Sequence, residues 1–488
     1  MNTSRRVVVA VAVLCCSIAA AWAGPLQDDL KARRARVMER LGPESLLIVW
    51  GEPNAENLYY LTGTEQDDSI LVLMPGNTDQ KEVLFVRPFN ARREHWDGHS
   101  LTPKEATALT AVDRVFTLDQ FEPFIESIFS GRLWRLESRA SDAGEAAPEI
   151  EATAFDKALE SNRARLALIL GRRSLTGPVD KPLEFANRLR ERFGGFSLQD
   201  ATEVIHGLRQ IKTTYEQGIM RRSLEISSEA HRAGMRAAAP GRYEYEVESA
   251  IEAVYLQNGA MRPGYESIVG SGPNANILHY RESSRRMEPN DLLLVDAAGS
   301  YQGYTGDITR TYPVSGTFTR EQREIYELVL AAQEAGIKAA MAGARRTDIT
   351  RACADVIKAG LLKLGLITDA SGDQYRVWYT HGPVHWLGLN VHDVGTTDVL
   401  APGMLFVIEP GVYIRDQALD TLPATKENLA FIEQVRPAAK KYANTGVRIE
   451  DSFLLTEAGL ERLSSTVPRT VEEIESFMRG RPTTSAGR

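Results

Sequence analysis

An α/β domain followed by an α+β domain is the architecture that the sequence predicts. The chain has 488 residues, which is long for one domain and favours two. Up to about residue 205, short apolar segments alternate with helical stretches, as in an α/β domain. Beyond that point, helical segments occur in pairs around apolar strands that we expect to be antiparallel, which indicates an α+β domain.

The first domain is expected over residues 24–205, with apolar runs as its strands. A continuous run such as SLLIVW is typical of a buried strand. The expected elements, in chain order, are a helix over 31–40, strands over 45–50, 69–74 and 82–86, and a helix over 118–130. Residues 137–160 turn to Ala, Glu and Ser, which predicts a surface insertion.

The second domain is expected over residues 206–475, followed by a polar tail over 476–488. A long helical pattern begins at Lys212 and ends before Pro240 and Gly241, which is a typical helix stop. The elements expected after it are strands over 292–297 and 307–314, helices over 320–342 and 348–364, and strands over 405–414 and 446–455.

The N-terminus has the organisation of a secretory signal peptide. Arg5 and Arg6 precede an apolar run over 7–21, and the small-x-small site Ala21-Trp22-Ala23 follows. We expect cleavage after Ala23, export to the periplasm or the medium, and no stable membrane anchor afterwards. The alternative is an N-terminal membrane anchor, for which the apolar run is short.

Removal of the signal peptide would leave one cysteine. Cys15 and Cys16 lie within the predicted signal, so only Cys353 belongs to the mature chain. An internal disulfide is then impossible, and the exported protein depends on its apolar core for stability.

The overall composition is that of a soluble globular protein. Apolar residues make up 43% of the chain and charged residues 25%. The net charge is −8 and no basic run stands out, which argues against nucleic acid as a main partner.

Three of the eight histidines of the chain fall in one short segment, HGPVHWLGLNVHDVG. His381 and His385 have the spacing of the HExxH zinc helix, in which both imidazoles project from one helical face. However, Gly382 stands where the catalytic Glu would be, and Pro383 disfavours a helix across the pair. A different geometry must therefore explain this cluster.

Four carboxylates interrupt apolar strands elsewhere in the second domain: Asp296, Asp307, Glu409 and Glu450. A carboxylate in apolar surroundings must be paired or bind a cation, because its burial alone is costly. Two Asp, two Glu and one His would form an oxygen-rich site for two divalent ions if some carboxylates bridge, and two such ions can polarise a carbonyl. Oxygen-rich ligation favours Mn²⁺ over a structural zinc site.

Four motifs occur in the order VDAAGSYQGYTGDITRTYPVSG, HGPVHWLGLNVHDVG, IEPGVYI and GVRIEDSFLL. Together they resemble the Xaa-Pro aminopeptidases (the aminopeptidase P family), which share a pita-bread catalytic domain with prolidase, methionine aminopeptidase and creatinase. The resemblance covers residues 200–475 closely, and NLYYLTG in the first domain more loosely. It implies an α/β N-terminal domain plus an α+β C-terminal pita-bread (creatinase/aminopeptidase) catalytic domain.

The resemblance also implies a set of metal ligands. They are Asp296, Asp307, His385, Glu409 and Glu450, with Asp307 and Glu450 contacting both of two divalent ions. Mn²⁺ is the expected metal, and Zn²⁺ and Co²⁺ are alternatives. Only the middle histidine of the cluster is therefore expected to be a ligand.

The substrate side of the site is implied in the same way. His279, His381 and His392 match positions that hydrogen-bond the scissile peptide and the tetrahedral intermediate. Tyr413 and Arg448 match residues near the pocket for proline, and Trp96 is a weaker candidate for a first-domain contact to the substrate. Taken alone, His279 would be a core or loop histidine, Arg448 an exposed strand arginine, and Trp96 a packing residue.

Two features depart from the family pattern. Thr202 stands where some bacterial members carry an arginine, so a substrate contact made by that arginine is not expected here. The connection over 415–445 is long and rich in Ala, Lys and Glu, and is a candidate for shaping the pocket mouth or an oligomer contact.

The function that we expect is an exported two-metal exopeptidase that releases the N-terminal residue preceding proline. An Xaa-Pro bond is a tertiary amide without the N–H that most peptidases bind, so a dedicated pocket is needed. Glu409 is the candidate for handling the water proton, while His381 and His392 would stabilise the intermediate. We expect proline-containing peptides as substrates and a homo-oligomer, dimer or tetramer.

Three alternatives stay open at this point. A prolidase would cleave only Xaa-Pro dipeptides with the same ligands. A non-catalytic pita-bread binding protein would be expected to have lost ligands, and all five are present. Creatinase-like chemistry without metal is disfavoured for the same reason.

Overall fold

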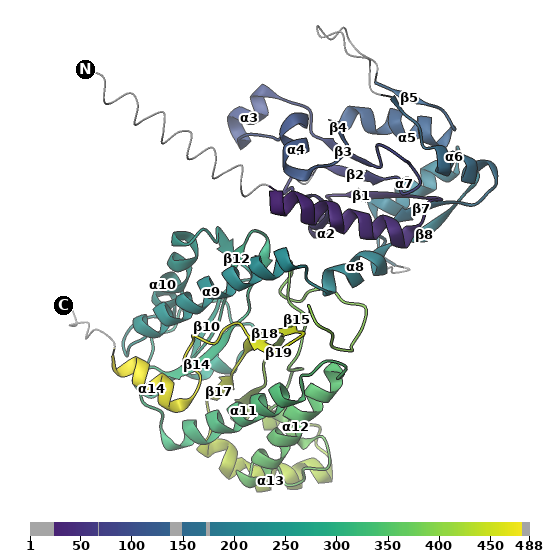
Figure 1. Cartoon of the computed structure of the whole chain (residues 1–488). Coiled ribbons are helices and arrows are strands. Elements are labelled where there is room, and N and C mark those ends of the chain that lie inside the picture. The colour runs from purple at the N-terminus through teal and green to yellow at the C-terminus, as the bar shows by residue number, and fades with distance from the viewer. Residues whose placement is uncertain (1–23, 67, 137–148, 172–175, 481–488) are drawn as a thin grey trace, which may run out of the picture. The chain divides into compact units, whose positions relative to one another are not determined.

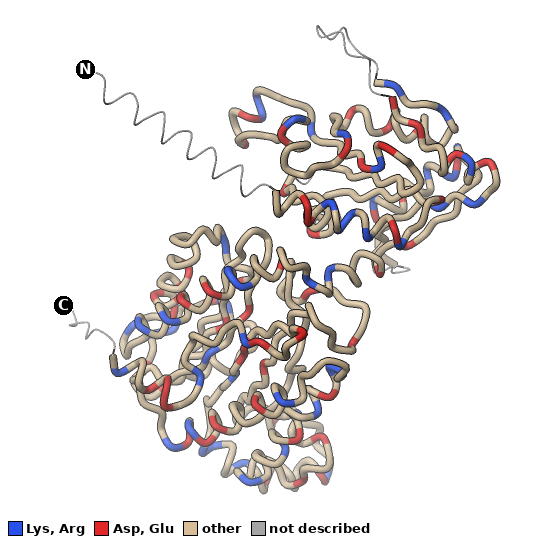
Figure 2. The backbone as a smooth tube through the Cα atoms, viewed as in Figure 1, with Lys and Arg blue, Asp and Glu red and all other residues tan. Residues whose placement is uncertain are grey.

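The computed structural model describes residues 24–66, 68–136, 149–171 and 176–480 (Figure 1). The chain divides into two compact units, one ending at Arg209 and the other beginning at Gln210. Acidic and basic residues are interspersed within each unit (Figure 2). The predicted signal peptide over 1–23 lies outside the described residues.

A mixed six-stranded sheet forms the centre of the first unit, in the order β4-β3-β2-β1-β7-β8. Neighbouring strands are parallel for β3–β4, β1–β7 and β7–β8, and antiparallel for β1–β2 and β2–β3. The first three strands are buried along their whole length, as their continuous apolar runs predict. The strands are β1 (Ser45–Trp50), β2 (Ile70–Leu73), β3 (Glu82–Val86), β4 (Arg114–Thr117), β7 (Ala164–Leu168) and β8 (Phe196–Asp200).

Helices surround this sheet. The expected helix over 31–40 is part of a longer one over 24–41. The expected helix over 118–130 is a short 3₁₀ turn, η1 (Leu118–Gln120), followed by α5 (Phe121–Phe129). The remaining helices are α2 (Ala55–Thr62), α3 (Ala91–Asp97), α4 (Pro103–Thr110), α6 (Thr153–Glu160), α7 (Lys181–Arg190) and α8 (Thr202–Gln210). Thr202, at the start of α8, accepts a hydrogen bond from the Leu170 N–H (3.1 Å).

The predicted surface insertion over 137–160 is wrong in its second half. Strand β6 (Glu149–Ile150) pairs with β5 (Trp134–Arg135), and α6 buries Phe155 and Ala158. Residues 153–160 therefore form an amphipathic helix rather than a solvated loop. Residues 137–148 lie outside the described part of the chain.

Small antiparallel sheets and long helices build the second unit. Helix α10 packs against α9 and helix α12 against α11 (Figure 1). The strands form the sheets β10-β11-β14, β13-β12-β9, β15-β18-β19 and β16-β17. Their bounds are β9 (Arg262–Pro263), β10 (Ile268–Ser271), β11 (Leu292–Asp296), β12 (Gly299–Tyr301), β13 (Tyr304–Thr305), β14 (Thr309–Pro313), β15 (Leu405–Ile408), β16 (Gly411–Ile414), β17 (Thr445–Arg448), β18 (Asp451–Thr456) and β19 (Gly459–Arg462). The helices are α9 (Thr214–Ala237), α10 (Glu244–Gln257), α11 (Arg320–Ala339), α12 (Arg346–Lys363), α13 (Lys426–Lys441) and α14 (Val471–Arg479).

Two strands that the sequence predicts as continuous are each interrupted at a glutamate. The run over 405–414 breaks at Glu409 and Pro410, between β15 and β16. The run over 446–455 breaks between Arg448 and Asp451, so that Glu450 lies between β17 and β18. Pro410 has no N–H for a central ladder, and after each break the chain pairs in a different sheet. Both glutamates therefore lie where the chain passes between the sheet β15-β18-β19 and the sheet β16-β17.

The long connection over 415–445 is mostly helical. It contains the 3₁₀ segment η4 (Asp416–Thr421) and then α13, which begins at the N-cap residue Thr425. Phe431, Val435 and Ala439 face the core, which explains the apolar component of this segment. In the described ranges, no helix combines the length and apolar character needed to span a bilayer.

Candidate metal centre

The five side chains that the sequence suggested as metal ligands line one cavity of the second unit. Asp296 ends β11, Asp307 stands just before β14, and His385 lies in an irregular segment between α12 and β15. Glu409 and Glu450 occupy the two strand breaks. All five border a cavity of about 510 Å³. Five separate segments of the chain therefore meet at one place.

The ring nitrogen Nε2 of His385 lies among three carboxylates. It is 3.4 Å from Asp307 Oδ2, 3.5 Å from Glu409 Oε1 and 3.9 Å from Glu450 Oε1. Asp307, His385 and Glu450 offer ligand atoms that all lie within 4.8 Å of one another. A single cation can be contacted by several of these side chains at once.

The backbone next to His385 explains how its ring is directed. The segment is not helical, as Pro383 predicts, and runs beside β15 instead. Val407 N–H donates to His385 O (3.1 Å), and Glu409 N–H donates to Pro383 O (2.9 Å). The Nδ1 of His385 lies 3.1 Å from Trp386 O and donates to it, which leaves the Nε2 lone pair facing the carboxylates.

Burial dominates the electrostatics of three of the carboxylates, and Arg448 offsets it only in part at Glu409 and Glu450. Burial, reinforced by Asp296, raises the pKa of Asp307 well above its ordinary value. Burial raises the pKa of Glu450 and of Glu409 in the same direction, with Asp307 acting on the first and Glu450 on the second. A divalent cation would remove this cost, because it compensates the charges that burial disfavours.

The donor set fits a hard divalent metal ion. It consists of carboxylate oxygens and one imidazole, without a thiolate, which suits Mn²⁺ better than a structural zinc site. Burial, and then the neighbouring His392, lower the pKa of His385 to about 4, so its ring is neutral near pH 7 and can act as a ligand. Cys353 is buried within α12 and is not among the residues that line the cavity.

Asp296 interacts mainly with two other polar side chains. Its Oδ2 accepts a hydrogen bond from Arg448 Nη2 at 2.5 Å. The Tyr265 hydroxyl lies 2.6 Å from Asp296 Oδ1 and 2.5 Å from Asp307 Oδ1. Tyr265 thus joins the two aspartates from the cavity wall.

His381, His392 and His279 border the same cavity. His381 Nε2 lies 2.8 Å from Tyr413 Oη, and its Nδ1 lies 3.7 Å from Glu409 Oε2. Burial, and then Arg448, lower the pKa of His381 to about 4. The His392 ring lies 4.4 Å from the His385 ring, measured between centroids. The structure therefore places all three beside the ligand cluster.

Arg448 and Tyr413 form a buried pair at the edge of this cluster. Arg448 Nη1 donates to Tyr413 Oη at 2.9 Å, and Arg448 also borders the cavity. The interpretation of Arg448 alone as an exposed strand arginine is thus wrong, since only 3% of it is exposed. Trp96 belongs to the first unit, lies on α3 and is 75% exposed.

Tyr265 is the contact that sequence reasoning missed. It lies in an irregular stretch before β10, within PGYESIV, and no pattern in that stretch marks a functional residue. Its partners Asp296 and Asp307 are 31 and 42 residues away in the chain, so only the packed fold brings them together. A tyrosine followed by a buried strand is too common a pattern to have identified it.

Comparisons with known proteins identify the family of the chain. Residues 218–457 match the model of metallopeptidase family M24, and residues 30–134 match the aminopeptidase P N-terminal domain. The Xaa-Pro aminopeptidase of Escherichia coli is 31% identical over 476 residues, which cover 93% of this chain and 98% of that protein. The human Xaa-Pro dipeptidase is 35% identical over 301 residues, covering 56% of this chain and 60% of that protein.

A solved structure of an aminopeptidase P is similar to this chain over nearly its whole length. Escherichia coli aminopeptidase P in complex with substrate is 29% identical and superimposes with a TM-score of 0.75, covering 93% of this chain and 98% of that one. The family and the fold class predicted from the sequence are thereby confirmed. The chain belongs to the aminopeptidase P family, and its second unit is an M24 pita-bread metallopeptidase domain.

Proposed function

We propose that this protein is an Xaa-Pro aminopeptidase, which releases the N-terminal residue from peptides with proline in the second position. The observation that supports this most is the convergence of three carboxylates on His385 Nε2. A relative named Xaa-Pro aminopeptidase, similar over nearly its whole length, agrees with it. The cavity at the cluster is large enough for a short peptide end.

Two divalent ions complete this proposal. Asp296, Asp307, His385, Glu409 and Glu450 would hold them, and Asp307 and Glu450 are the residues expected to be shared. The ions would lower the pKa of a water molecule and polarise the scissile carbonyl. Mn²⁺ is the ion we expect for this donor set, with Zn²⁺ and Co²⁺ as alternatives.

The remaining chemistry belongs to the protein's own side chains. Glu409 accepts the proton of the attacking water, since its carboxylate borders the cavity and lies within the ligand cluster, 3.5 Å from His385 Nε2. His381 and His392 donate hydrogen bonds to charge that develops on the substrate. His381 can do so while neutral, because a neutral imidazole still carries one N–H.

The wall of the cavity suits a proline side chain. Ile268, Leu278, Val384 and Val391 give it an apolar part beside the polar cluster. A pyrrolidine ring has no charge and no N–H in an Xaa-Pro bond, so its recognition depends on such surface.

A peptide-length series distinguishes this activity from that of a prolidase. Xaa-Pro, Xaa-Pro-Yaa and Xaa-Ala-Yaa peptides are offered to the Mn²⁺-loaded protein, and the released residues are quantified. We expect release of the first residue from Xaa-Pro-Yaa and little from Xaa-Ala-Yaa. Cleavage of the dipeptide alone would instead establish the prolidase, which the similarity to the human dipeptidase keeps as the second candidate. Glu409→Gln serves as the control for contaminating peptidases.

Export is a separate proposal that rests on the N-terminal sequence. The pair Arg5-Arg6, the apolar run over 7–21 and the site ending at Ala23 support it. Mass spectrometry of the protein from its native host should show Gly24 as the first residue. Recovery of the full-length chain from the cytoplasm contradicts the proposal. Assembly into a dimer or tetramer likewise stays a prediction, for which sedimentation velocity is the measurement.

A further inference from the structure

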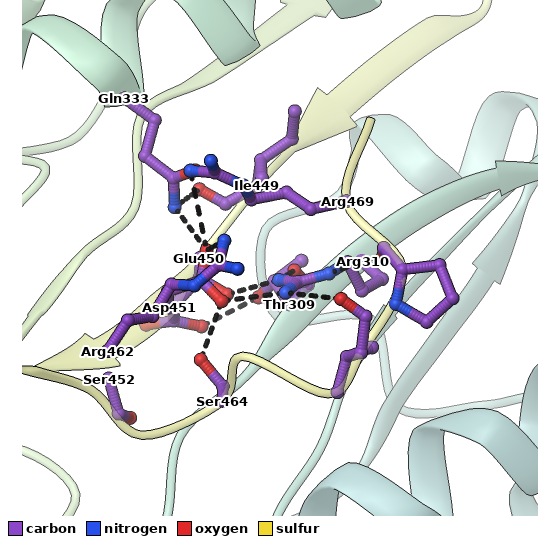
Figure 3. A network of polar contacts seen from close by, with 12 residues as sticks. Thr309, Arg310, Gln333, Ile449, Glu450, Asp451, Ser452, Arg462, Ser464 and Arg469 are labelled. Carbon is purple, nitrogen blue, oxygen red and sulfur yellow. Dashed lines mark hydrogen bonds and ion pairs between the residues drawn. The ribbon is translucent and has the colours of Figure 1, made fainter. Parts of the chain in front are cut away.

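A buried polar cluster lies directly behind Glu450 (Figure 3). We call it the polar hub and define it as Arg310, Gln333, Asp451 and Ser464, all of which are 0% exposed. None of the four is among the residues that line the cavity. Burial of an ion pair such as Arg310–Asp451 is often no more stabilising than apolar packing, so stability alone does not account for this arrangement.

Gln333 connects the hub to the two strand breaks that carry Glu409 and Glu450. It lies on α11, and its side-chain Nε2 donates to Ile408 O (3.0 Å) and Ile449 O (3.2 Å). These are the carbonyls immediately before Glu409 and Glu450. One amide group thus joins the ends of two strands at the points where each strand turns towards the cavity.

Asp451 and Arg310 form further hydrogen bonds around the strand break at Glu450. Gln333 Nε2 also lies 3.1 Å from Asp451 Oδ2, while Arg310 Nη2 donates to Asp451 Oδ1 at 2.6 Å. Arg310 Nη1 donates to the carbonyl of Glu450 itself at 2.6 Å. Ser464 Oγ adds a hydrogen bond to Asp451 Oδ1 at 2.5 Å. The backbone on either side of the Glu450 side chain is therefore held by charged or amide groups.

Strand β14 restrains the Glu450 side chain as well. Thr309 Oγ1 donates to Glu450 Oε2 at 2.8 Å, and Glu450 N–H donates to Thr309 O at 3.1 Å. Arg310 follows Thr309 directly, so the residue that orients the carboxylate and the residue that joins the hub are neighbours on one strand. The hub and the ligand cluster therefore meet at the same strand break, the one that carries Glu450.

We propose that the polar hub sets the separation of Glu409 and Glu450, with Gln333 as the positioning residue that joins their strands. This inference rests on the proposed two-metal function, in which both glutamates are ligands. Two cations that share carboxylates need donor atoms at a defined spacing, and outer groups that orient ligands typically change metal affinity or activity by about 10–100-fold when they are lost. The apolar side chains around the hub cannot provide this, because they place no directional bond on either carbonyl.

The test uses Gln333→Met in the full-length protein, since methionine has a similar length and no donor. Val329→Ala is the matched control, because Val329 lies one turn earlier on α11, is equally buried and belongs to the apolar core. Each protein is freed of metal with a chelator and titrated with Mn²⁺ in a calorimeter. Turnover is then measured at saturating Mn²⁺ over a range of Xaa-Pro-Yaa concentrations.

We expect Gln333→Met to bind at least one Mn²⁺ about 10-fold more weakly or worse, and to lose kcat with little change in KM. Val329→Ala should unfold more readily yet bind Mn²⁺ with the affinity of the wild type. If Gln333→Met is less stable but binds both ions normally, the hub is a structural cluster and the inference is wrong.

A second variant covers the case in which Gln333→Met does not fold. Ser464→Ala removes one hydrogen bond to Asp451 and should weaken Mn²⁺ binding in the same direction to a smaller extent. Unchanged affinity in that variant contradicts the inference. A wild-type protein that binds only one Mn²⁺ contradicts the two-metal proposal on its own, independently of how the variants compare with it.

Discussion

His385 and His392 have adjacent rings, but their surroundings assign them different tasks. His385 directs Nε2 at three carboxylates and has its other nitrogen occupied by a backbone carbonyl. The His392 ring lies 4.4 Å from that ring between centroids, at an interplanar angle of 75°, and borders the cavity. His381 interacts with Tyr413 and lies near Glu409. One histidine is thus placed as a ligand and two are placed on the substrate side.

Replacement of the three histidines by alanine should separate these roles. His385→Ala should lose metal and activity together, because Nε2 is the nitrogen donor of the cluster. His381→Ala and His392→Ala should keep near-normal metal content but turn over about 10²–10³-fold more slowly, the usual effect of losing one donor to developing charge. Metal stoichiometry beside turnover is the measurement. Loss of ions in His392→Ala comparable to His385→Ala would show that this division of roles is mistaken.

The two aspartates should also differ. Asp307 lies 3.4 Å from His385 Nε2 and belongs to the group of closely spaced ligand atoms, whereas Asp296 is held by Arg448. Asp307→Asn should therefore reduce Mn²⁺ content and turnover more than Asp296→Asn does. Calorimetric titration of both variants measures this, with Tyr265→Phe to report what the shared hydroxyl contributes. Equal losses in the two aspartate variants would argue against Asp307 as the shared ligand.

At the scale of elements, close backbone contacts hold the strands that carry the site. Gly446, in β17, packs against the 3₁₀ segment η2 (Gly272–Asn276), which leads towards His279. A Cβ at Gly446 would lie 2.2 Å from the carbonyl oxygen of Ala275, a distance that no rotamer change can relieve. The absence of a side chain at this position is a requirement of packing rather than of backbone conformation.

Gly446→Ala should therefore destabilise the protein and reduce its activity. We expect about 1–3 kcal/mol, the usual cost of forced overpacking, together with slower turnover because β17 carries Arg448. Gly218→Ala is the control, since Gly218 lies exposed in α9 with open space around it and should gain about 0.5–1 kcal/mol in the helix. Denaturant unfolding of both variants provides the measurement. A stable Gly446→Ala protein would mean that β17 and η2 separate easily.

The strand breaks at Glu409 and Glu450 show which features of a strand a local sequence pattern can predict. The strands β1 and β3 have the predicted bounds, because a buried strand needs an unbroken apolar run. The runs over 405–414 and 446–455 are equally apolar, yet each breaks where a glutamate turns into the cavity. The break depends on which sheet each half joins, and this is decided by partners far along the chain.

At the scale of the whole molecule, one buried histidine outside the cavity makes stability depend on pH. His231, in α9, is 0% exposed and its Nε2 lies 2.9 Å from the carbonyl oxygen of Ala297. Burial, and then Arg310, lower its pKa to about 4. The unfolded chain would have a histidine pKa near 6.5 and so binds the proton more readily.

The sign of the effect follows from this difference. Above a pH of about 6.5 the contribution of neutral His231 to folding stability is fully present, and it is lost as the pH falls towards 4. His231→Gln should lose less stability than the wild type on going from pH 7 to pH 5, by about 2 kcal/mol. Urea unfolding of the chelated proteins measures it, so that metal binding does not add a second pH dependence. Parallel losses in both proteins would show that His231 is not the group responsible.

The sequence by itself determined the family, the two fold classes and the residue types of the site. It did so because apolar runs, helix stops and four ordered motifs are local patterns that any packing of this chain must respect. Only the tertiary structure decided which groups touch. Tyr265 reaches Asp296 and Asp307, Arg448 meets Asp296, and Gln333 joins two strand ends, each across a chain separation of more than 30 residues. Such contacts depend on how helices and sheet corners pack in space, and no stretch of sequence around one partner specifies the other.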